Sequence, residues 1–263
     1  MKIKLLSLLL FAPLALLASC NDAEGLLSEV SQNGDTSQND TSISTSLTPK
    51  QIAVADFAAT NFTIDILSQG EVIAKEKFDG KYIQGWSKKS KTGELDVDGY
   101  YVMTAEGVRA VTYNRDTESY IAYPQTLPYI AENFTIDFIT GQFLKESLAE
   151  QIEAIDEADI SYNEGVYHID EVIFHIDEAK AHLLWTGKAY TGEDHNYEYD
   201  IKNLEFTLDE SKHLASLYLE SKGWQINSDG DFVTLERYDV TNLNLYSYRT
   251  TSFEIPDAVA SLS

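Results

Sequence analysis

Apolar and polar residues alternate over long parts of the chain, beginning at residue 61. The run Asn61–Ile66 alternates three polar with three apolar residues, and comparable runs recur as far as Tyr123. A period of two is typical of strands with one buried face, so these runs predict an antiparallel β meander. Three Asp-Gly pairs between apolar runs predict hairpin turns: Asp79-Gly80, Asp98-Gly99 and Asp229-Gly230.

A second set of apolar runs predicts a second meander in the later part of the chain. Its predicted strands are Val166–Ile169, Val172–Ile176, Ala181–Trp185, Tyr197–Ile201, Leu204–Leu208, Leu214–Leu219, Phe232–Leu235 and Leu243–Tyr246.

Two helices are predicted from different patterns. Thr48-Pro49-Lys50-Gln51 offers a capping hydroxyl, a proline at the first helical position and a glutamine three residues after the cap, which predicts a helix over 49–59. Between the meanders, apolar residues at helical spacing predict a helix over 141–157, while 127–139 is ambiguous between helix and strand. These elements predict an α+β fold in a single domain spanning 48–263.

The N-terminus has the pattern of a secretory signal that ends in a lipoprotein box. Lys2 and Lys4 precede an apolar run, Leu5–Leu17, and the sequence Leu17-Ala18-Ser19-Cys20 follows at its edge. Because Cys20 is the only cysteine, we expect removal of 1–19 and lipidation of Cys20. The alternative is an ordinary signal peptide that is cut near Ala18. The apolar run has about 13 residues and a transmembrane helix needs about 20, so a membrane span is disfavoured.

Residues 20–47 are predicted to be a lipidated N-terminus followed by a polar tether. Ser, Thr, Asn, Asp and Gln dominate this stretch, and such residues bury too little apolar surface to offset the entropy of ordering. As a flexible coil it would reach about 30 Å. We therefore expect a protein of the bacterial cell envelope, lipid-anchored to the outer face of a membrane.

Charge excludes several classes of partner. After loss of Lys2 and Lys4 the chain carries 43 acidic and 17 basic side chains, an excess of 26 negative charges. Nucleic acids and anionic membrane surfaces are bound through Lys and Arg clusters, so neither is an expected partner. A single cysteine allows no internal disulfide and argues against structural zinc or iron–sulfur sites. We expect no cofactor and a monomer.

Candidate chemistry is sparse. His168, His175 and His182 recur every seven residues, which would align them on a helix, but the surrounding residues predict strands, where a step of seven alternates faces. We therefore predict solvated histidines and no metal triad. Asn227–Asp231 resembles the start of a calcium loop, but Tyr238 occupies the twelfth position, where such a loop needs glutamate. The chain has no recognised catalytic motif and is predicted to be non-enzymatic.

Aromatic residues offer two interpretations. Tyrosine, phenylalanine and tryptophan are good strand formers and would simply fill a half-buried sheet. Alternatively, some of them line an apolar cavity beneath a curved sheet and bind a ligand. The candidates for that lining are Trp86, Tyr101, Phe174, Trp185 and Phe206.

Several short segments resemble the lipoprotein-carrier superfamily of the LolA, LolB and LppX type. They are Asn61-Phe62-Thr63-Ile64-Asp65, Asp98-Gly99-Tyr100-Tyr101, Thr112-Tyr113-Asn114-Arg115, Val166-Tyr167-His168-Ile169 and Leu204-Glu205-Phe206-Thr207-Leu208-Asp209. The resemblance implies a strongly curved antiparallel sheet, an unclosed barrel, with helices covering its concave face, and lipid or lipid-linked cargo in the hollow. The hallmark arginine of the carriers has no clear counterpart here; Arg109 and Arg115 are the candidates.

Three functions follow as expectations. The first is a membrane-anchored lipoprotein that binds or carries an apolar, lipid-like ligand or a lipoprotein in a hydrophobic cavity. The second is a surface lipoprotein whose packed β scaffold meets a protein partner. The third is a hydrolase with an unrecognised site. A hollow on the inner face of the sheet would favour the first function, and a filled core the second.

Overall fold

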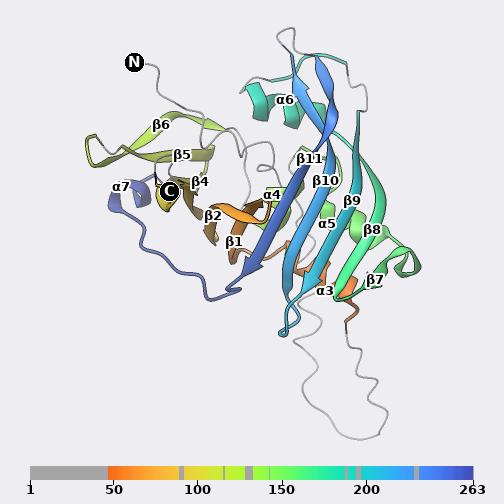
Figure 1. Cartoon of the computed structure of the whole chain (residues 1–263). Coiled ribbons are helices and arrows are strands. Elements are labelled where there is room, and N and C mark those ends of the chain that lie inside the picture. The colour runs from red at the N-terminus through yellow and green to blue at the C-terminus, as the bar shows by residue number, and fades with distance from the viewer. Residues whose placement is uncertain are drawn as a thin grey trace, which may run out of the picture.

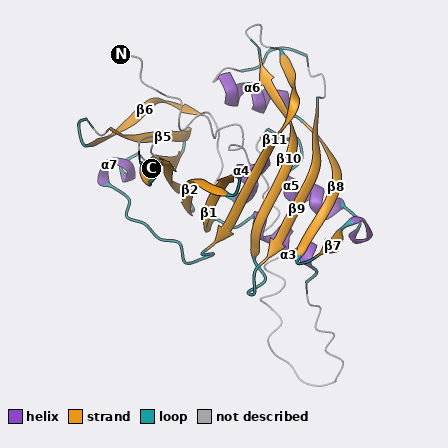
Figure 2. Cartoon of the chain, in the orientation of Figure 1, coloured by secondary structure: helices purple, strands orange, loops and turns teal. Residues whose placement is uncertain are grey.

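The described part of the chain forms one antiparallel sheet of eleven strands with a few short helices. The computed structural model describes residues 47–88, 92–114, 116–127, 133–141, 143–186, 189–193, 197–227 and 231–262. The strand order is β6-β5-β4-β3-β2-β1-β11-β10-β9-β8-β7 (Figures 1 and 2). The sheet is not closed, because β6 and β7 lie at its two edges. An α+β class with an open antiparallel sheet is therefore confirmed.

Two meanders build this sheet and meet at β1 and β11. The first half contains α3 (Pro49–Phe57), β1 (Asn61–Ser68), β2 (Glu71–Asp79), β3 (Tyr82–Lys88), β4 (Leu95–Thr104), β5 (Gly107–Asn114) and β6 (Ser119–Leu127). The second contains α4 (Ile136–Gly141), α5 (Leu148–Ala154), η1 (Glu157–Asp159), β7 (Ser161–Asn163), β8 (Val166–His175), α6 (Glu178–Thr186), β9 (Glu198–Leu208), β10 (Leu214–Ile226), β11 (Phe232–Tyr246) and α7 (Asp257–Ala260).

Helix α3 begins where the sequence predicts it. The hydroxyl of Thr48 accepts a hydrogen bond from the backbone N–H of Gln51, and the Gln51 side chain accepts one from the backbone N–H of Thr48, at 3.3 and 2.9 Å. This reciprocal capping box satisfies two N–H groups that a helix start would otherwise leave unpaired. The helix ends at Phe57, two residues before the predicted end.

Loss of this cap should be measurable. Thr48→Ala removes the acceptor for the Gln51 N–H, so we expect the free energy of unfolding to fall by about 1 kcal/mol. Urea denaturation followed by circular dichroism gives that value. Thr48→Ser keeps a hydroxyl and should be close to wild type; equal losses in the two variants would contradict the capping role.

The predicted helix over 141–157 is wrong in its bounds. Within this range the α-helix α5 covers only Leu148–Ala154. Helix α4 ends at Gly141 and begins in 127–139, the segment that the sequence left ambiguous between helix and strand, and the segment that contains Phe143 and Leu144 separates it from α5. The break has a local cause, because Ser147 and Glu150 form a second capping box that starts α5 afresh. Asp137 of α4 accepts a hydrogen bond from the backbone N–H of Ala149, at 3.3 Å, and so links the two helices.

Two other local predictions are also corrected. Asp98 and Gly99 lie inside β4 rather than in a turn, because β3 and β4 shift register at Gly85/Trp86 and accommodate the pair within the ladder. Ala181–Trp185 belongs to helix α6 and not to a strand. The turn at Asp79-Gly80 is confirmed between β2 and β3, whereas Asp229-Gly230 lies outside the described residues.

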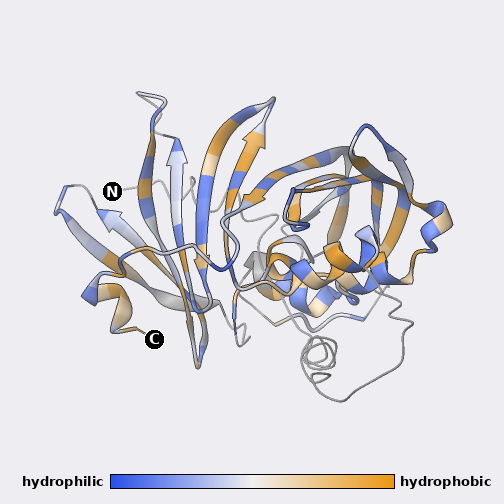
Figure 3. Cartoon of the chain, turned by 90° about the horizontal axis from the view of Figure 1, so that it is seen from below, coloured by the Kyte–Doolittle hydropathy of each residue, from blue (hydrophilic) through white to orange (hydrophobic). Residues whose placement is uncertain are grey.

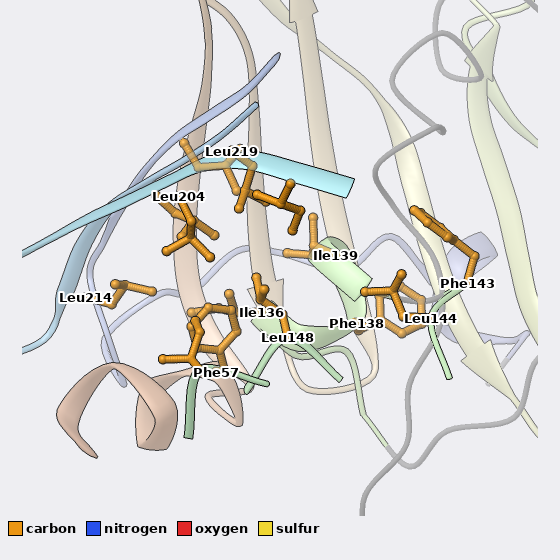
Figure 4. Close-up of a cluster of buried hydrophobic side chains, with 14 of the residues drawn as sticks. Phe57, Ile136, Phe138, Ile139, Phe143, Leu144, Leu148, Leu204, Leu214 and Leu219 are labelled. Atoms are coloured by element: carbon orange, nitrogen blue, oxygen red, sulfur yellow. The ribbon is translucent and has the colours of Figure 1, made fainter. Parts of the chain in front are cut away.

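The main hydrophobic core joins both halves of the sheet to helices α3, α4 and α5. Figure 4 shows helix residues such as Phe57 and Leu148 close to the strand residues Leu204, Leu214 and Leu219. Figure 3 shows hydrophobic and hydrophilic positions alternating along the strands, as expected for strands with one buried face.

A smaller core lies on the opposite face of the first half. After β11 the chain crosses to α7 beside β4 and β5 (Figure 1), where Val259 packs with Tyr100, Val102 and Val111. Both faces of this half-sheet therefore carry buried side chains.

Candidate functional site

Two of the predicted ligand-lining residues are enclosed by protein. Phe174 on β8 and Phe206 on β9 are 0% and 1% exposed and belong to the main core. Phe206 stacks on Tyr167, with ring centroids 4.9 Å apart. Both rings are thus already occupied by protein contacts.

The structure does not bring Trp86 and Tyr101 together. Tyr101 is the cross-strand partner of Ile83 and packs against the main core. Trp86 lies three residues after Ile83 on β3 and therefore points to the opposite face, where the Lys77 ammonium lies 5.0 Å from its ring centroid. The side chain of Trp185 lies outside the described residues. A role of the five aromatics in binding stays a prediction.

The three histidines lie on two elements. His168 and His175 are on β8 and His182 is on α6. Glu171, with a φ of 46°, interrupts the alternation of β8, so that both strand histidines point away from the main core rather than to opposite faces. Among the described residues there is no group of three or more His, Cys, Asp or Glu side chains that could hold a metal ion.

The remaining sequence candidates fall partly outside the described residues. This applies to Cys20 and Arg115, and to three of the five residues of the calcium-like segment. Arg109 lies on β5, 3.6 Å from a carboxylate oxygen of Glu106, and its Nε is buried without a hydrogen-bond partner among the described residues. In that same part of the chain, no helix is long and apolar enough to cross a membrane.

A carboxyl group that sequence reasoning missed stands on the core face of the first half. Glu76 lies on β2 between Ala74 and Phe78, which are 4% and 0% exposed, and it pairs with Ile64 on β1 and Gly85 on β3. Partners across a sheet share a face, so Glu76 points to the same side as Ile64 and Phe78. Alternation along β2 is the signal that could have revealed Glu76, because it places this glutamate on the same face as the apolar residues Ala74 and Phe78.

Glu76 lacks a charged partner among the described residues. Its side chain is half-buried, and it forms no hydrogen bond or ion pair within that part of the chain. Lys75 and Lys77 flank it in sequence but point to the other face. Lys75 there binds Tyr246 and Asp65, at 2.6 and 3.2 Å.

Electrostatics at this position follow from desolvation. Burial raises the pKa of Glu76 to about 7, because the charged form loses solvation that no partner replaces. Burial also raises the pKa of Tyr101, and the nearby Glu76 and Tyr123 add to that shift. The two side chains thus influence one another on the same face of the sheet.

Small residues lie beside this carboxyl. Glu76 pairs with Gly85, and Gly85 pairs with Gly99, so two glycines follow Glu76 across the strands. A Cβ added at Gly85 would meet only the Gly99 carbonyl oxygen, at 4.0 Å, among described atoms within that distance. At Gly99 an added Cβ would clash with the carbonyl oxygen of Val111, so this glycine is required by the close approach of β5, and only Gly85 leaves space beside Glu76 and near Tyr101.

Ionisation of Glu76 should destabilise the fold as pH rises. The carboxyl titrates near its ordinary pKa of 4.5 when unfolded and at about 7 when folded. Stability should therefore fall between these values, by an amount on the order of 3 kcal/mol. Glu76→Gln cannot ionise, so its free energy of unfolding should lose less between pH 5 and pH 8 in urea titrations.

The exposed Glu94→Gln serves as the control for charge and should keep the wild-type pH dependence. This control is needed because other groups also contribute to the pH dependence of stability: burial raises the pKa of Asp137 to about 6. Identical pH profiles for Glu76→Gln and Glu94→Gln would contradict an energetic role of the Glu76 carboxyl.

Comparisons with known proteins add little. No protein-family model and no curated protein matches the chain. A crystal structure at 1.90 Å of a protein of unknown function from Bacteroides fragilis aligns with 11% sequence identity and a TM-score of 0.14, covering 67% of this chain and 88% of that chain. A TM-score this low carries no argument about fold or function. The resemblance to the lipoprotein carriers stays a prediction.

Proposed function

We propose that this protein is a lipid-anchored, extracytoplasmic lipoprotein that binds or carries an apolar, lipid-like ligand without catalysis. The ligand lies against the inner face of β2–β5, over Gly85 and beside Glu76 and Tyr101. One observation carries the proposal: among the described residues, the Glu76 carboxyl has no charged partner and stands next to Gly85 on the face that carries the main core. A ligand with an apolar chain and a polar head matches that combination.

The distribution of bulky side chains supports this half of the sheet as the binding region. In the second half, α3–α5 insert Phe57, Ile136 and Leu148 into the core, and these residues are no more than 1% exposed. In the first half, the cross-strand partner of Glu76 is Gly85, where an added Cβ would meet no described atom closer than 4.0 Å. In the proposal the sheet curves, helices cover its concave face, and the hollow lies over Gly85.

Attachment to the membrane comes from the lipid on Cys20 and the polar tether over 20–47. The excess of 26 negative charges in the mature chain disfavours adsorption to anionic headgroups, so the domain would stand clear of the bilayer at the end of its tether. A ligand could then be exchanged from the aqueous side.

Native mass spectrometry of the full chain, purified gently from cells, tests this function. We expect a fraction of the protein to carry an additional mass corresponding to an amphiphile. Gly85→Val should lower that fraction, because its side chain would occupy the space beside Glu76, whereas Gly85→Ala adds one carbon in van der Waals contact and should have a smaller effect. An unliganded mass for the wild type, or equal occupancy in all three proteins, would contradict the proposal.

A packed scaffold that binds a protein partner is the second candidate. It is favoured by the filled core of the second half and by two exposed apolar residues, Ile173 on β8 and Val240 on β11, each 54% exposed. Both point away from the main core. If this candidate holds, the double variant Ile173→Lys, Val240→Lys should lose a partner that crosslinks to the wild type on cells, while Gly85→Val should retain it.

A further inference from the structure

We infer that the ligand held beside Glu76 is a cationic amphiphile whose protonated primary amine pairs with the Glu76 carboxylate. This inference rests on the proposed function and names the chemical class of its ligand.

Glu76 needs a positive partner that the described chain does not supply. A carboxylate taken out of water is costly unless a cation or several hydrogen-bond donors compensate it. The nearest lysines in sequence are engaged on the opposite face, Lys75 with Asp65 and Tyr246 and Lys77 over the Trp86 ring. The missing cation would therefore come with the ligand.

The groups facing Glu76 from the neighbouring strands are neutral or acidic. On its own face, β1 presents Ile64 and β3 presents Gly85, followed by Ser87. Strand β4 presents Tyr101 and also carries Asp98, which accepts a hydrogen bond from Ser87. Asp96 of β4 pairs with Ser87 and therefore faces the same side, and Tyr123 of β6 acts on Tyr101. An ammonium placed beside Glu76 meets that carboxylate and the Tyr101 ring, and both attract cations.

Net charge favours the same head group. The mature chain carries 43 acidic and 17 basic side chains, so its field attracts cations and repels carboxylate or phosphate heads. Fatty acids and anionic phospholipids are thus poorly matched to a site whose polar group is itself an acid. An alkyl amine satisfies both the local carboxyl and the overall charge.

Protonation of Glu76 makes the affinity for the amine depend on pH. Above neutral pH the carboxyl is ionised, and an alkyl amine, like a lysine side chain, is still protonated, so the two attract. Below neutral pH the carboxyl takes up a proton and the charge pair is lost. Binding of the amine should therefore tighten as pH rises from 6 to 8.

Isothermal titration calorimetry with three probes of equal chain length provides the test: n-decylamine, n-decanol and n-decanoate, each below its micelle concentration. The protein is the full chain carrying Cys20→Ser, so that no attached lipid competes. At pH 8 we expect n-decylamine to bind most tightly. Glu76→Gln should weaken n-decylamine about 10- to 100-fold, the value of a charged hydrogen bond, and leave n-decanol nearly unchanged.

Glu94→Gln removes the same charge from an exposed position and should bind n-decylamine like the wild type. Equal weakening in both variants would show that general acidity attracts the amine and would overturn the inference. Equal binding of all three probes, or preference for n-decanoate, would overturn the assignment of an amine head group but would leave the proposal of ligand binding intact. Binding of none of the probes, together with an unliganded native mass, would overturn the proposed function as well.

Discussion

Replacing Phe62 by alanine should lower the free energy of unfolding by about 3 to 5 kcal/mol. Phe62 lies on β1, is 0% exposed and stacks on Phe78 of β2, with ring centroids 4.4 Å apart. Tyr248 contributes a second aromatic contact at 6.2 Å. Truncation removes the transfer free energy of the ring and leaves a cavity that close-packed neighbours fill only in part.

The position of Phe62 in the sheet makes this effect global. Strand β1 pairs with β11, which is the contact between the two meanders. We therefore expect a single unfolding transition at lower urea concentration, with both halves lost together. Equilibrium unfolding followed by tyrosine and tryptophan fluorescence measures this.

Tyr113→Ala is the matched control for Phe62→Ala. Tyr113 is also an aromatic residue on a strand but is 36% exposed, so its removal should cost about 1 kcal/mol or less. Similar losses for the two variants, or a first transition confined to one half in Phe62→Ala, would contradict the joining role of β1. If Phe62→Ala does not fold, Phe62→Leu gives the same ordering with a smaller loss.

Local patterns in the sequence were sufficient for α3 and for most strand positions. The Thr48-Pro49-Lys50-Gln51 segment contains the whole capping box, because both of its hydrogen bonds join residues three apart. Strand β1 follows from alternation, whereas β4 and β5 follow from apolar runs, since each of these two strands contributes residues to a core on both faces. In these segments the local preference and the tertiary structure agree.

One five-residue sequence shows where local patterns fail. Asn-Phe-Thr-Ile-Asp occurs at 61–65, where it lies in β1, and at 133–137, where it leads into α4. In β1 the Thr63 hydroxyl shares a hydrogen bond with a threonine of the C-terminal segment. Before α4 the Thr135 hydroxyl accepts one from the backbone N–H of Phe138 and caps the helix. Identical residues adopt different structures because their surroundings differ: the first copy pairs with β2 and β11, whereas the second is followed by residues that form a helix.

The candidate site depended on register, which alternation alone does not fix. Nothing local shows that Glu76 faces Gly85 or that Tyr101 lies on the same face. Trp86 lies on the opposite face from Tyr101, because it is three residues after Ile83, the cross-strand partner of Tyr101; aromatic composition had grouped the two residues. A shift of one residue in the pairing of a strand moves each of its side chains to the other face of the sheet. A site formed by several strands therefore cannot be predicted before the register is known.

Cys20→Ser should move the protein from the membrane fraction to the soluble fraction of cells. In our proposal the only attachment is the lipid that forms on the Cys20 thiol, and a serine hydroxyl cannot replace that thiol. A single acyl chain holds a protein weakly and two or more hold it stably, so loss of all chains removes most of the membrane affinity. The acidic domain offers no compensating attraction to anionic headgroups.

Fractionation by ultracentrifugation, followed by immunoblotting of pellet and supernatant, measures the Cys20→Ser result. Ser31→Ala, in the polar tether, should stay in the membrane fraction, because it leaves the thiol and the cleavage site intact. A Cys20→Ser protein that still pellets after a high-salt wash would reveal a different anchor and would favour the interpretation of Cys20 as a stray cysteine beyond an ordinary cleavage site. Because ligand binding by the domain does not depend on the lipid, the two proposals fail separately: a soluble Cys20→Ser protein that still binds an amphiphile supports the domain function, whichever way the anchor is resolved.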